Sequence, residues 1–481
     1  MRRLLKALPL FGFSFSEISV AFVRMFILTH ILGPFEFGFA AAISAAYATI
    51  EQITDIAIFR FVSSSPRSVQ VEAIAGAHAL TILRGFFLAT CILVFSYPIA
   101  CALAGCGNWP SFAWLAPVTI IKSFEDLEIR VGERDYRYWP QLIASLVSHG
   151  AGIVALIVVA YETGSHYAFI AYLLVQAAAY VVASHILASN PYQVEWNTPY
   201  FRKALAFGFP LLLNGAGLAL VGQGDRLMVG ALLGLPTLGL YAVVVLAGLV
   251  PISGIIRILG PLFFAGLHNA RDVSSKYVAR VRLFSRLYPI VAGCYALALI
   301  AVLKTAIPLV FGSRFIVSNL AVLVIASTAF FRIVRLEPHT SLLLNAQKTR
   351  ALALSNLSSL IGLIAATILI LIYPSIEGAL IGVLIGEFVG LSFAVSATKE
   401  LLKSAIVDYA ISVSAVMIVV AGSAALVFLT HSSDNILIRI AISGGACILI
   451  LAGACIFLPK FYRRAYTSRH RIHEFEVPKT E

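Results

Sequence analysis

The chain of 481 residues is 60% hydrophobic and only 12% charged, with a mean hydropathy of +0.93. A water-soluble fold could not bury that much apolar surface, so the composition excludes a soluble globular protein and indicates an integral membrane protein. The formal net charge of +12 does not indicate nucleic-acid binding, because the basic residues lie mainly in loops and helix ends between apolar segments.

The apolar segments have about the length, near 20 residues, that a helix needs to cross the hydrocarbon core of a bilayer. The first begins like a signal peptide but lacks a small-residue cleavage site, so we expect it to be retained as a membrane helix. The sequence therefore predicts an all-α integral membrane protein with about 14 transmembrane helices. They are expected at residues 9–32, 38–62, 78–104, 110–129, 139–161, 166–188, 207–234, 238–260, 285–303, 315–333, 351–373, 376–396, 405–429 and 436–458.

The distribution of Lys and Arg predicts the orientation of these helices. Most of the 35 basic residues fall on alternate loops and helix ends, together with both termini. The opposite turns, GPFEFG, ETGSH, GLPTLG and YPS, contain none. Because cytoplasmic loops are enriched in basic residues, we expect both termini to lie in the cytoplasm.

One stretch of sequence occurs twice. Arg24–Ala40 reads RMFILTHILGPFEFGFA, and 201 residues later Asp225–Tyr241 reads DRLMVGALLGLPTLGLY. In each copy an apolar helix runs into a turn bracketed by two glycines. This repeat predicts two lobes of six helices related by an axis along the membrane normal. The predicted parts are a first lobe at 1–188, a cytoplasmic linker at 189–206, a second lobe at 207–400, two additional C-terminal helices at 401–460 and a basic cytoplasmic tail at 461–481.

Charged residues occur at matched depths in the two copies. Arg24 and the Asp225–Arg226 pair lie about 13 Å below the turn that follows them. Charge at this depth is costly and indicates function by default. Guanidinium groups suit phosphate binding, so Arg24, Asp225, Arg226 and, deeper in the second lobe, Arg257 are candidate substrate-binding residues. The alternatives are a structural ion pair for the first three and a side chain that reaches the cytoplasmic surface for Arg257.

Three membrane-embedded carboxylates are candidate ion-coupling residues. Glu51 and Asp55 are expected one turn apart on one face of the second helix. A desolvated carboxylate could bind a proton or a sodium ion during transport. Ion pairing with Arg24 or Arg60 is an equal alternative. Glu387 is the third candidate, since the glycines around it permit close helix packing.

A group of charges at the inner end of the predicted fourth helix is a candidate gate. Lys122, Glu125 and Asp126 could close the cytoplasmic mouth through ion pairs. The alternative, which we favour, is a solvated helix end whose charges compensate one another through i,i+3 and i,i+4 pairs.

Catalytic and cofactor motifs are absent from the sequence. It has no P-loop, no H-E-x-x-H and no recognisable serine nucleophile motif. The six cysteines form no C-x-x-C and lie in apolar runs, so we expect small buried residues rather than metal ligands or disulfides. We therefore expect no enzyme and no cofactor.

Three segments carry a resemblance to a known family. LTHILGPFEFGFAAAISA, ERDYRYWPQLIASLVSHGAG and FGFPLLLNGAG, the last followed by GDRLMVGALLGLPTLGLYAV, resemble bacterial polysaccharide-repeat flippases, the Wzx-like branch of the MOP (MATE-like) superfamily. The resemblance extends over roughly residues 9–400. It implies a two-lobed, MATE-like transporter in the bacterial inner membrane. Such a protein moves polyprenyl-diphosphate-linked oligosaccharide repeat units from the cytoplasmic to the periplasmic leaflet by alternating access, for surface polysaccharide synthesis. Its expected partners are this lipid-linked oligosaccharide, membrane lipids and polysaccharide-assembly proteins, and not nucleic acid.

Other functions remain open at this point. A cation-coupled exporter of drugs or small molecules with the same fold would use an acidic, aromatic cavity around Glu51 and Asp55. A membrane-embedded glycosyltransferase or polymerase is disfavoured by the short outer loops. A non-transporting scaffold of a polysaccharide-assembly complex would tolerate removal of the deep charges.

Overall fold

The computed structural model describes residues 2–65, 70–132, 137–268, 270, 274–402, 405–429 and 435–467. Within these ranges it contains helices and no strands, in agreement with the predicted all-α fold. The helices are α1 (Arg2–Ile31), α2 (Pro34–Ile53), α3 (Ile58–Ser64), α4 (Gln70–Leu103), η2 (Cys106–Asn108), α5 (Trp109–Ala113), α6 (Leu115–Lys122), α7 (Glu128–Val131), α8 (Trp139–Thr163), α9 (Tyr167–Leu187), α10 (Thr198–Leu233), α11 (Leu235–His268), α12 (Ser274–Phe311), α13 (Asn319–Leu336), α14 (His339–Asn345), α15 (Thr349–Ser358), α16 (Ile361–Ile372), α17 (Ile376–Leu402), α18 (Ala405–Leu429) and α19 (Ile436–Thr467).

Eleven helical segments of the described chain are long and apolar enough to cross a membrane. The membrane-protein fold is therefore confirmed, whereas the predicted count of about 14 spans is not. Each of the 14 predicted segments does fall on helical structure. The last helix, α19, continues to Thr467, and residues 468–481 of the predicted basic tail lie outside the described residues.

Several helices predicted as continuous are broken. The segment predicted at 38–62 consists of α2 and α3, with the non-helical residues Thr54–Ala57 between them. The segment predicted at 110–129 is divided into α5, α6 and α7, and α15 is separated from α16 within 351–373. Hydropathy averaged over a whole segment does not reveal these breaks, because a few polar residues are outweighed by the apolar residues on either side.

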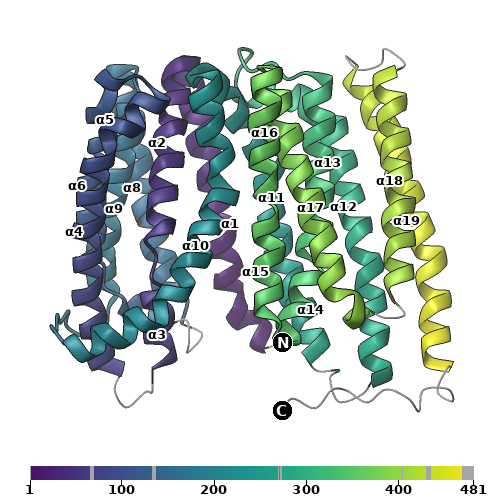
Figure 1. Ribbon diagram of the computed structural model, residues 1–481, viewed down its shortest axis with the longest axis horizontal. Coiled ribbons are helices and arrows are strands. Elements are labelled where there is room, and N and C mark those ends of the chain that lie inside the picture. The colour runs from purple at the N-terminus through teal and green to yellow at the C-terminus, as the bar shows by residue number, and fades with distance from the viewer. Residues whose placement is uncertain are drawn as a thin grey trace. The chain divides into compact units, whose positions relative to one another are not determined.

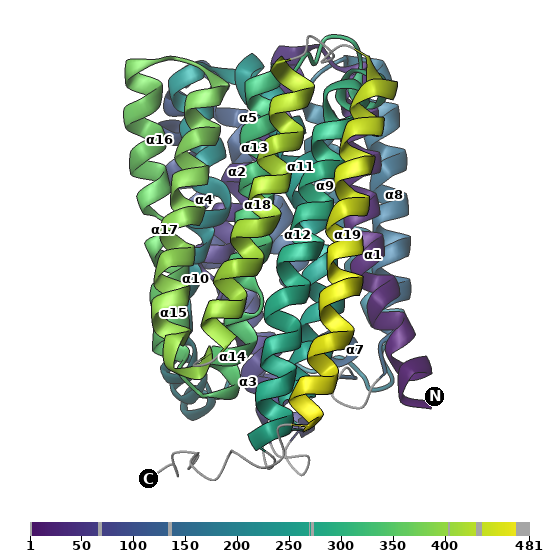
Figure 2. The same ribbon diagram turned by 90° about the vertical axis from the view of Figure 1, so that its right-hand side faces the viewer.

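The chain forms two compact units, Met1–Val243 and Val244–Glu481. In the first unit α8 packs against α9, α4 packs against α5 and α6, and α10 lies along α2 (Figure 1). In the second unit α12 packs against α13 and against the C-terminal helices α18 and α19 (Figure 2), and α16 packs against α17. The division into two six-helix lobes stays a prediction.

The two repeated turns lie against each other within the first unit. A Cβ atom added to Gly38, in the first turns of α2, would lie 1.8 Å from the carbonyl oxygen of Leu235, the first residue of α11. A Cβ atom on Gly239 would lie 3.4 Å from the Gly38 Cα atom and 3.0 Å from the Phe37 ring. The repeated glycines thus allow two helix N-termini to approach at backbone distance.

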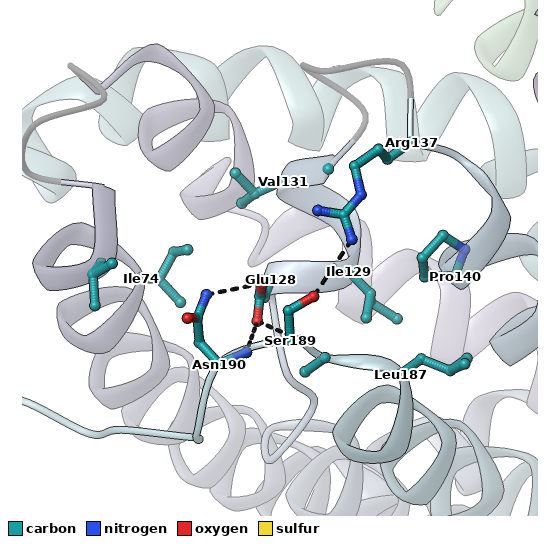
Figure 3. Close-up of a pocket in the computed structure, with 12 residues that line it drawn as sticks. Ile74, Glu128, Ile129, Val131, Arg137, Pro140, Leu187, Ser189 and Asn190 are labelled. Atoms are coloured by element: carbon teal, nitrogen blue, oxygen red, sulfur yellow. Dashed lines mark hydrogen bonds between the residues drawn. The ribbon is translucent and has the colours of Figure 1, made fainter. Parts of the chain in front are cut away.

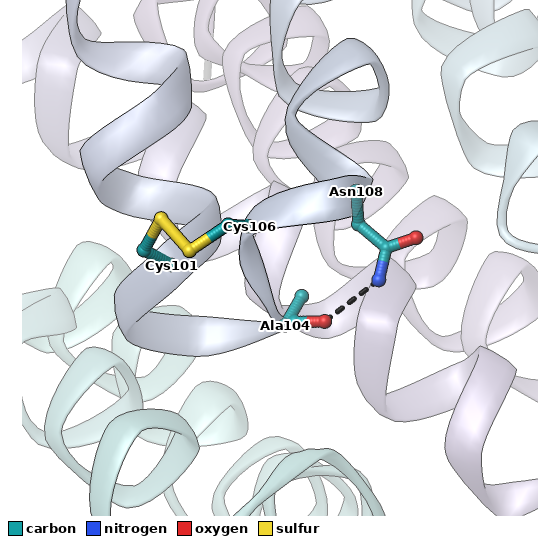
Figure 4. Close-up of a disulfide and its surroundings, with 4 residues drawn as sticks. All are labelled: Cys101, Ala104, Cys106 and Asn108. Carbon is teal, nitrogen blue, oxygen red and sulfur yellow. Dashed lines mark hydrogen bonds between the residues drawn. A yellow bond between two sulfur atoms is a disulfide. The ribbon is translucent and has the colours of Figure 1, made fainter.

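The structure corrects the expectation for two of the cysteines. Cys101, in the last turn of α4, forms a disulfide with Cys106 at the start of η2 (Figure 4). The chain turns through Gly105, whose φ is 88°, and this turn brings the two Cα atoms within 4.0 Å. The spacing is not that of C-x-x-C, so nothing in the sequence indicated the bond. Cys91, Cys294 and Cys447 are free and partly buried, as expected.

The crossing at Gly38 predicts a selective effect of one methyl group. Gly38→Ala should destabilise the protein by about 1–3 kcal/mol, because the added Cβ atom has to displace backbone rather than a flexible side chain. Gly33→Ala is the matched control, since a Cβ atom there meets nothing within 4 Å. Thermal unfolding of the two purified variants in detergent checks this, and equal losses would contradict the close crossing.

Candidate functional site

The break between α2 and α3 exposes backbone groups within the second predicted membrane segment. Glu51 lies about 26 Å along the helix from Pro34, where α2 begins. The end of a helix leaves backbone carbonyl groups without partners. Arg84 of α4 supplies them: its Nε donates to the Thr54 carbonyl oxygen at 2.9 Å, and one terminal nitrogen donates to the Glu51 carbonyl oxygen at 3.0 Å. One guanidinium group therefore caps the broken helix.

An ion pair lies beside this break. The Nζ atom of Lys122, the last residue of α6, donates to Oε1 of Glu51. The side chains of Glu51 and Lys122 are 32% and 41% exposed, so the pair is not sealed in the protein. Polar and irregular structure at membrane depth is tolerated where it is buried in protein or lines a water-filled space. The partial exposure of this pair favours the second case.

Glu51 and Asp55 are not on one helix face, so that prediction is wrong. The helix ends at Ile53, and Asp55 lies in the break, where its Oδ1 atom accepts a hydrogen bond from the Ala57 N–H at 2.9 Å. Glu51 pairs with Lys122 rather than with Arg24 or Arg60. The sequence placed Arg84 among the few basic residues away from the cytoplasmic loops, and this was the signal that could have identified it.

The three predicted gate residues lie in separate contacts. Lys122 pairs with Glu51, whereas Glu125 accepts a hydrogen bond from Arg130 at 3.2 Å. Asp126 lies 3.5 Å from the His78 ring and accepts from the Glu128 N–H. Because α6 ends at Lys122, the pairs that a continuous helix would form do not arise here.

Arg24 lies against aromatic side chains. Its guanidinium carbon is 5.0 Å from the ring centroids of both Phe169 and Tyr172 on α9, which is cation–π geometry. The Tyr172 hydroxyl lies 2.7 Å from Nδ1 of His149, and Nε2 of His149 lies 3.2 Å from Oε1 of Glu17. A polar chain thus connects α1, α8 and α9. Glu17 and His149 each stand alone in a largely apolar run of the sequence, so nothing there marks them as partners.

Asp225 is held by a tyrosine rather than by an arginine. The Tyr241 hydroxyl donates to Oδ2 of Asp225 at 2.6 Å, which joins α10 to the start of α11. The Arg226 guanidinium donates to Oε1 of Gln223 at 2.6 Å. Among the described contacts no ion pair joins Asp225 to Arg226 or Arg24. The structural ion pair that the sequence left open is therefore not found.

In the second unit, Glu387 is bound by two arginines of α13. The Arg332 Nε donates to one carboxylate oxygen at 2.6 Å, and the Arg335 Nε donates to the other at 2.7 Å. Arg335 also donates to the Asn356 side chain at 3.0 Å. The sequence assigned both arginines to a cytoplasmic helix end, and nothing in it marked them as partners of Glu387. Arg257, on α11, is exposed.

A cavity of about 240 Å³ lies at the predicted inner end of the first unit (Figure 3). Within it Glu128 accepts hydrogen bonds from the backbone N–H groups of Ser189 and Asn190, and Arg137 donates to the Ser189 hydroxyl at 3.4 Å. These contacts hold the end of α9 against α7. The predicted site residues do not line this cavity.

Comparison with known proteins assigns the family. A family model described as "Polysaccharide biosynthesis protein" matches residues 27–320. The chain belongs to this family. A comparison of the chain with curated proteins finds no match.

Solved structures of transporters share its fold. The lipid II flippase MurJ, in an inward closed conformation, aligns over 95% of this chain and 99% of its own at 13% identity, with a TM-score of 0.65. An inward-facing multidrug resistance MATE transporter of the MOP superfamily aligns over 83% and 95% at 14% identity, with a TM-score of 0.54. A eukaryotic MATE transporter aligns over 86% and 99% at 15% identity, with a TM-score of 0.55. The chain thus has the fold of these flippases and transporters.

The Glu51–Lys122 pair predicts energetic coupling between two helices. Glu51→Gln and Lys122→Met should each destabilise the protein, and the double variant should recover about 1 kcal/mol relative to the sum, because neither partner is then left unpaired. Double-mutant analysis of thermal unfolding measures this. Lys122→Met combined with Glu36→Gln, at the far end of α2, is the control and should be additive. Additivity of the Glu51 and Lys122 effects would show that the pair does not form.

Proposed function

We propose that this transporter moves polyprenyl-diphosphate-linked oligosaccharide repeat units from the cytoplasmic to the periplasmic leaflet by alternating access. The observation that carries the proposal is the partly exposed Glu51–Lys122 ion pair beside the break in α2. A hydrated, charged surface at this depth suits a polar headgroup that crosses the membrane while its lipid tail stays in the bilayer. Membership of the polysaccharide biosynthesis family, and the fold shared with a lipid II flippase, support this substrate class.

In this proposal Arg24 and Arg226 of the first unit contact the diphosphate, and Arg257 is a further substrate-binding residue of the second unit. Arginine presents several N–H donors in a planar fork that matches phosphate oxygens. The guanidinium of Arg24 lies over two aromatic rings, which leaves donors at its edge for a ligand. Asp225, anchored by Tyr241, contributes by fixing the helix that carries Arg226.

The remaining predicted residues have roles in coupling and closure. Lys122 is attracted to Glu51 in the absence of substrate, and a substrate phosphate would compete for it. Exchange of partners at Glu51, beside Asp55 in the adjacent break, would couple ion movement to headgroup movement. Glu387 is the candidate ion-coupling residue of the second unit. Lys122, Glu125 and Asp126 would close the cytoplasmic side.

We further propose an inner-membrane location with both termini in the cytoplasm. Lys and Arg placement supports it, and so does the Cys101–Cys106 disulfide at the predicted outer end. Disulfides persist in oxidising compartments such as the periplasm and are rare in the cytosol. Membrane lipids and polysaccharide-assembly proteins are the expected partners.

Transport assays test the diphosphate contacts. In proteoliposomes that contain lipid-linked oligosaccharide, Arg24→Ala and Arg226→Ala should each slow its appearance in the opposite leaflet at least tenfold, since a charge-assisted hydrogen bond contributes about 1.5–3 kcal/mol. Arg314→Ala, at an exposed position between α12 and α13, is the control and should transport normally. Normal transport by both test variants would refute the diphosphate contacts, and export of organic cations instead of the lipid would favour the drug-exporter alternative.

Cysteine labelling of intact cells tests the orientation. In a variant that keeps only Cys101 and Cys106, a membrane-impermeant maleimide should label nothing until an impermeant reductant is added, and should then label both thiols. Both residues are exposed, so access is not limiting. Labelling before reduction would refute the disulfide, and labelling only after cell lysis would place this end in the cytoplasm.

A further inference from the structure

A buried carboxyl group in the second unit has no role in the function proposed above. Glu337 lies between α13 and α14, and only 4% of the residue is exposed. Its Oε1 atom accepts a hydrogen bond from the Ser341 hydroxyl at 3.0 Å. Gly260 of α11 packs against the same oxygen, since a Cβ atom added to it would lie 3.1 Å from Oε1 of Glu337. Three elements therefore enclose this carboxyl group: α11, α12 and the α13–α14 junction.

Polar atoms around Glu337 lack partners. Among the described residues, Oε2 of Glu337, the hydroxyl of Tyr288 and the hydroxyl of Ser285 form no hydrogen bond, although all three are buried. Ser285 and Tyr288 are 0% and 1% exposed and share one face of α12. Tyr288 is close enough to Glu337 for the two to interact electrostatically. Native proteins rarely leave such atoms unsatisfied, so an exchangeable species is expected here.

The ionisable groups near Glu337 are committed to other contacts. Arg335, two residues earlier, donates to Glu387 and Asn356. His339, two residues later, has its ring nitrogens 2.7 Å from the Thr398 hydroxyl and 3.0 Å from the Tyr409 hydroxyl. On α12, Arg282 and Arg286 lie against Asp408 of α18.

We propose that Glu337 is a proton-binding site, with the proton on Oε2, the carboxylate oxygen that has no hydrogen-bond partner. A buried carboxylate is strongly disfavoured unless a proton or counter-ion neutralises it. A metal cation suits the site less well, because hard cations such as calcium take six or more oxygen ligands, and one carboxylate oxygen is open here. The carboxylate takes up one proton from water on one side of the membrane and releases it to water on the other, with no other bond made or broken.

The consequence of this inference, that a proton gradient would drive or regulate flipping, rests on the proposed function. The site itself can be tested without transport. In the infrared spectrum of the purified full-length protein, the carbonyl stretch of a protonated carboxyl group should be present. Glu337→Gln should remove that contribution, whereas Glu377→Gln, in the first turn of α17, should leave it unchanged. Tyr288→Phe should shift the frequency of this band, since the hydroxyl dipole that interacts electrostatically with Glu337 is lost.

Stability separates a neutral group from an ionised one. If Glu337 carries a proton, Glu337→Gln replaces one neutral group with another of similar shape, and its thermal unfolding should match that of the wild type. An unchanged infrared band in Glu337→Gln would overturn the proposal. If that variant does not fold, Glu337→Asp decides: a shifted band supports the proposal, and an unshifted band contradicts it.

Transport then tests the consequence. A pH gradient across proteoliposomes should change the flipping rate of the wild type at least tenfold, and Glu337→Gln should respond less than twofold. An equal response of the two proteins would refute the coupling role. If the wild type moves no lipid-linked oligosaccharide, the proposed function fails, while the infrared result still decides whether Glu337 binds a proton.

Discussion

Lipid offers no hydrogen bonds, so each polar group inside the membrane has to find its partner in the protein or in water enclosed by the protein. This constraint explains the most unusual features of the chain. Arg84 caps the carbonyl groups that the break in α2 exposes. Glu387 is bound by two guanidinium groups. Asp225 is bound by a tyrosine hydroxyl. These contacts satisfy groups that would otherwise make the membrane segments unstable.

The contacts differ in how completely they enclose their charges. The Glu387 carboxylate is buried, whereas the Glu51–Lys122 pair remains about one-third exposed. A buried cluster stabilises packing, but an exposed pair can exchange partners with a ligand. The break in α2 is therefore the part of the first unit best suited to meet a polar headgroup. Arg24, stacked on Phe169 and Tyr172, adds a cation whose position is fixed by packing.

Sequence reasoning predicted the helical membrane fold and identified the two repeated glycine turns, whereas the depth of the charges in the membrane stays a prediction. Hydropathy and Lys and Arg placement depend on local composition, which the sequence contains. The partners of the charges depend on tertiary contacts, which it does not. Arg332 and Arg335 read as an ordinary cytoplasmic helix end, yet they bind Glu387. Thr54 and Asp55 lie between apolar segments that average as one continuous helix, so the end of α2 between Glu51 and Asp55 was not predicted, and neither was the Cys101–Cys106 bond.

The central claim is that the break in α2 faces water at membrane depth. Cysteine accessibility in a background without other cysteines tests it most directly, with Gln52→Cys in the exposed last turn of α2 compared with Phe87→Cys on the exposed apolar face of α4. The account predicts that a charged, water-soluble thiol reagent modifies position 52 and does not modify position 87. Equal protection of both positions from the reagent would contradict it.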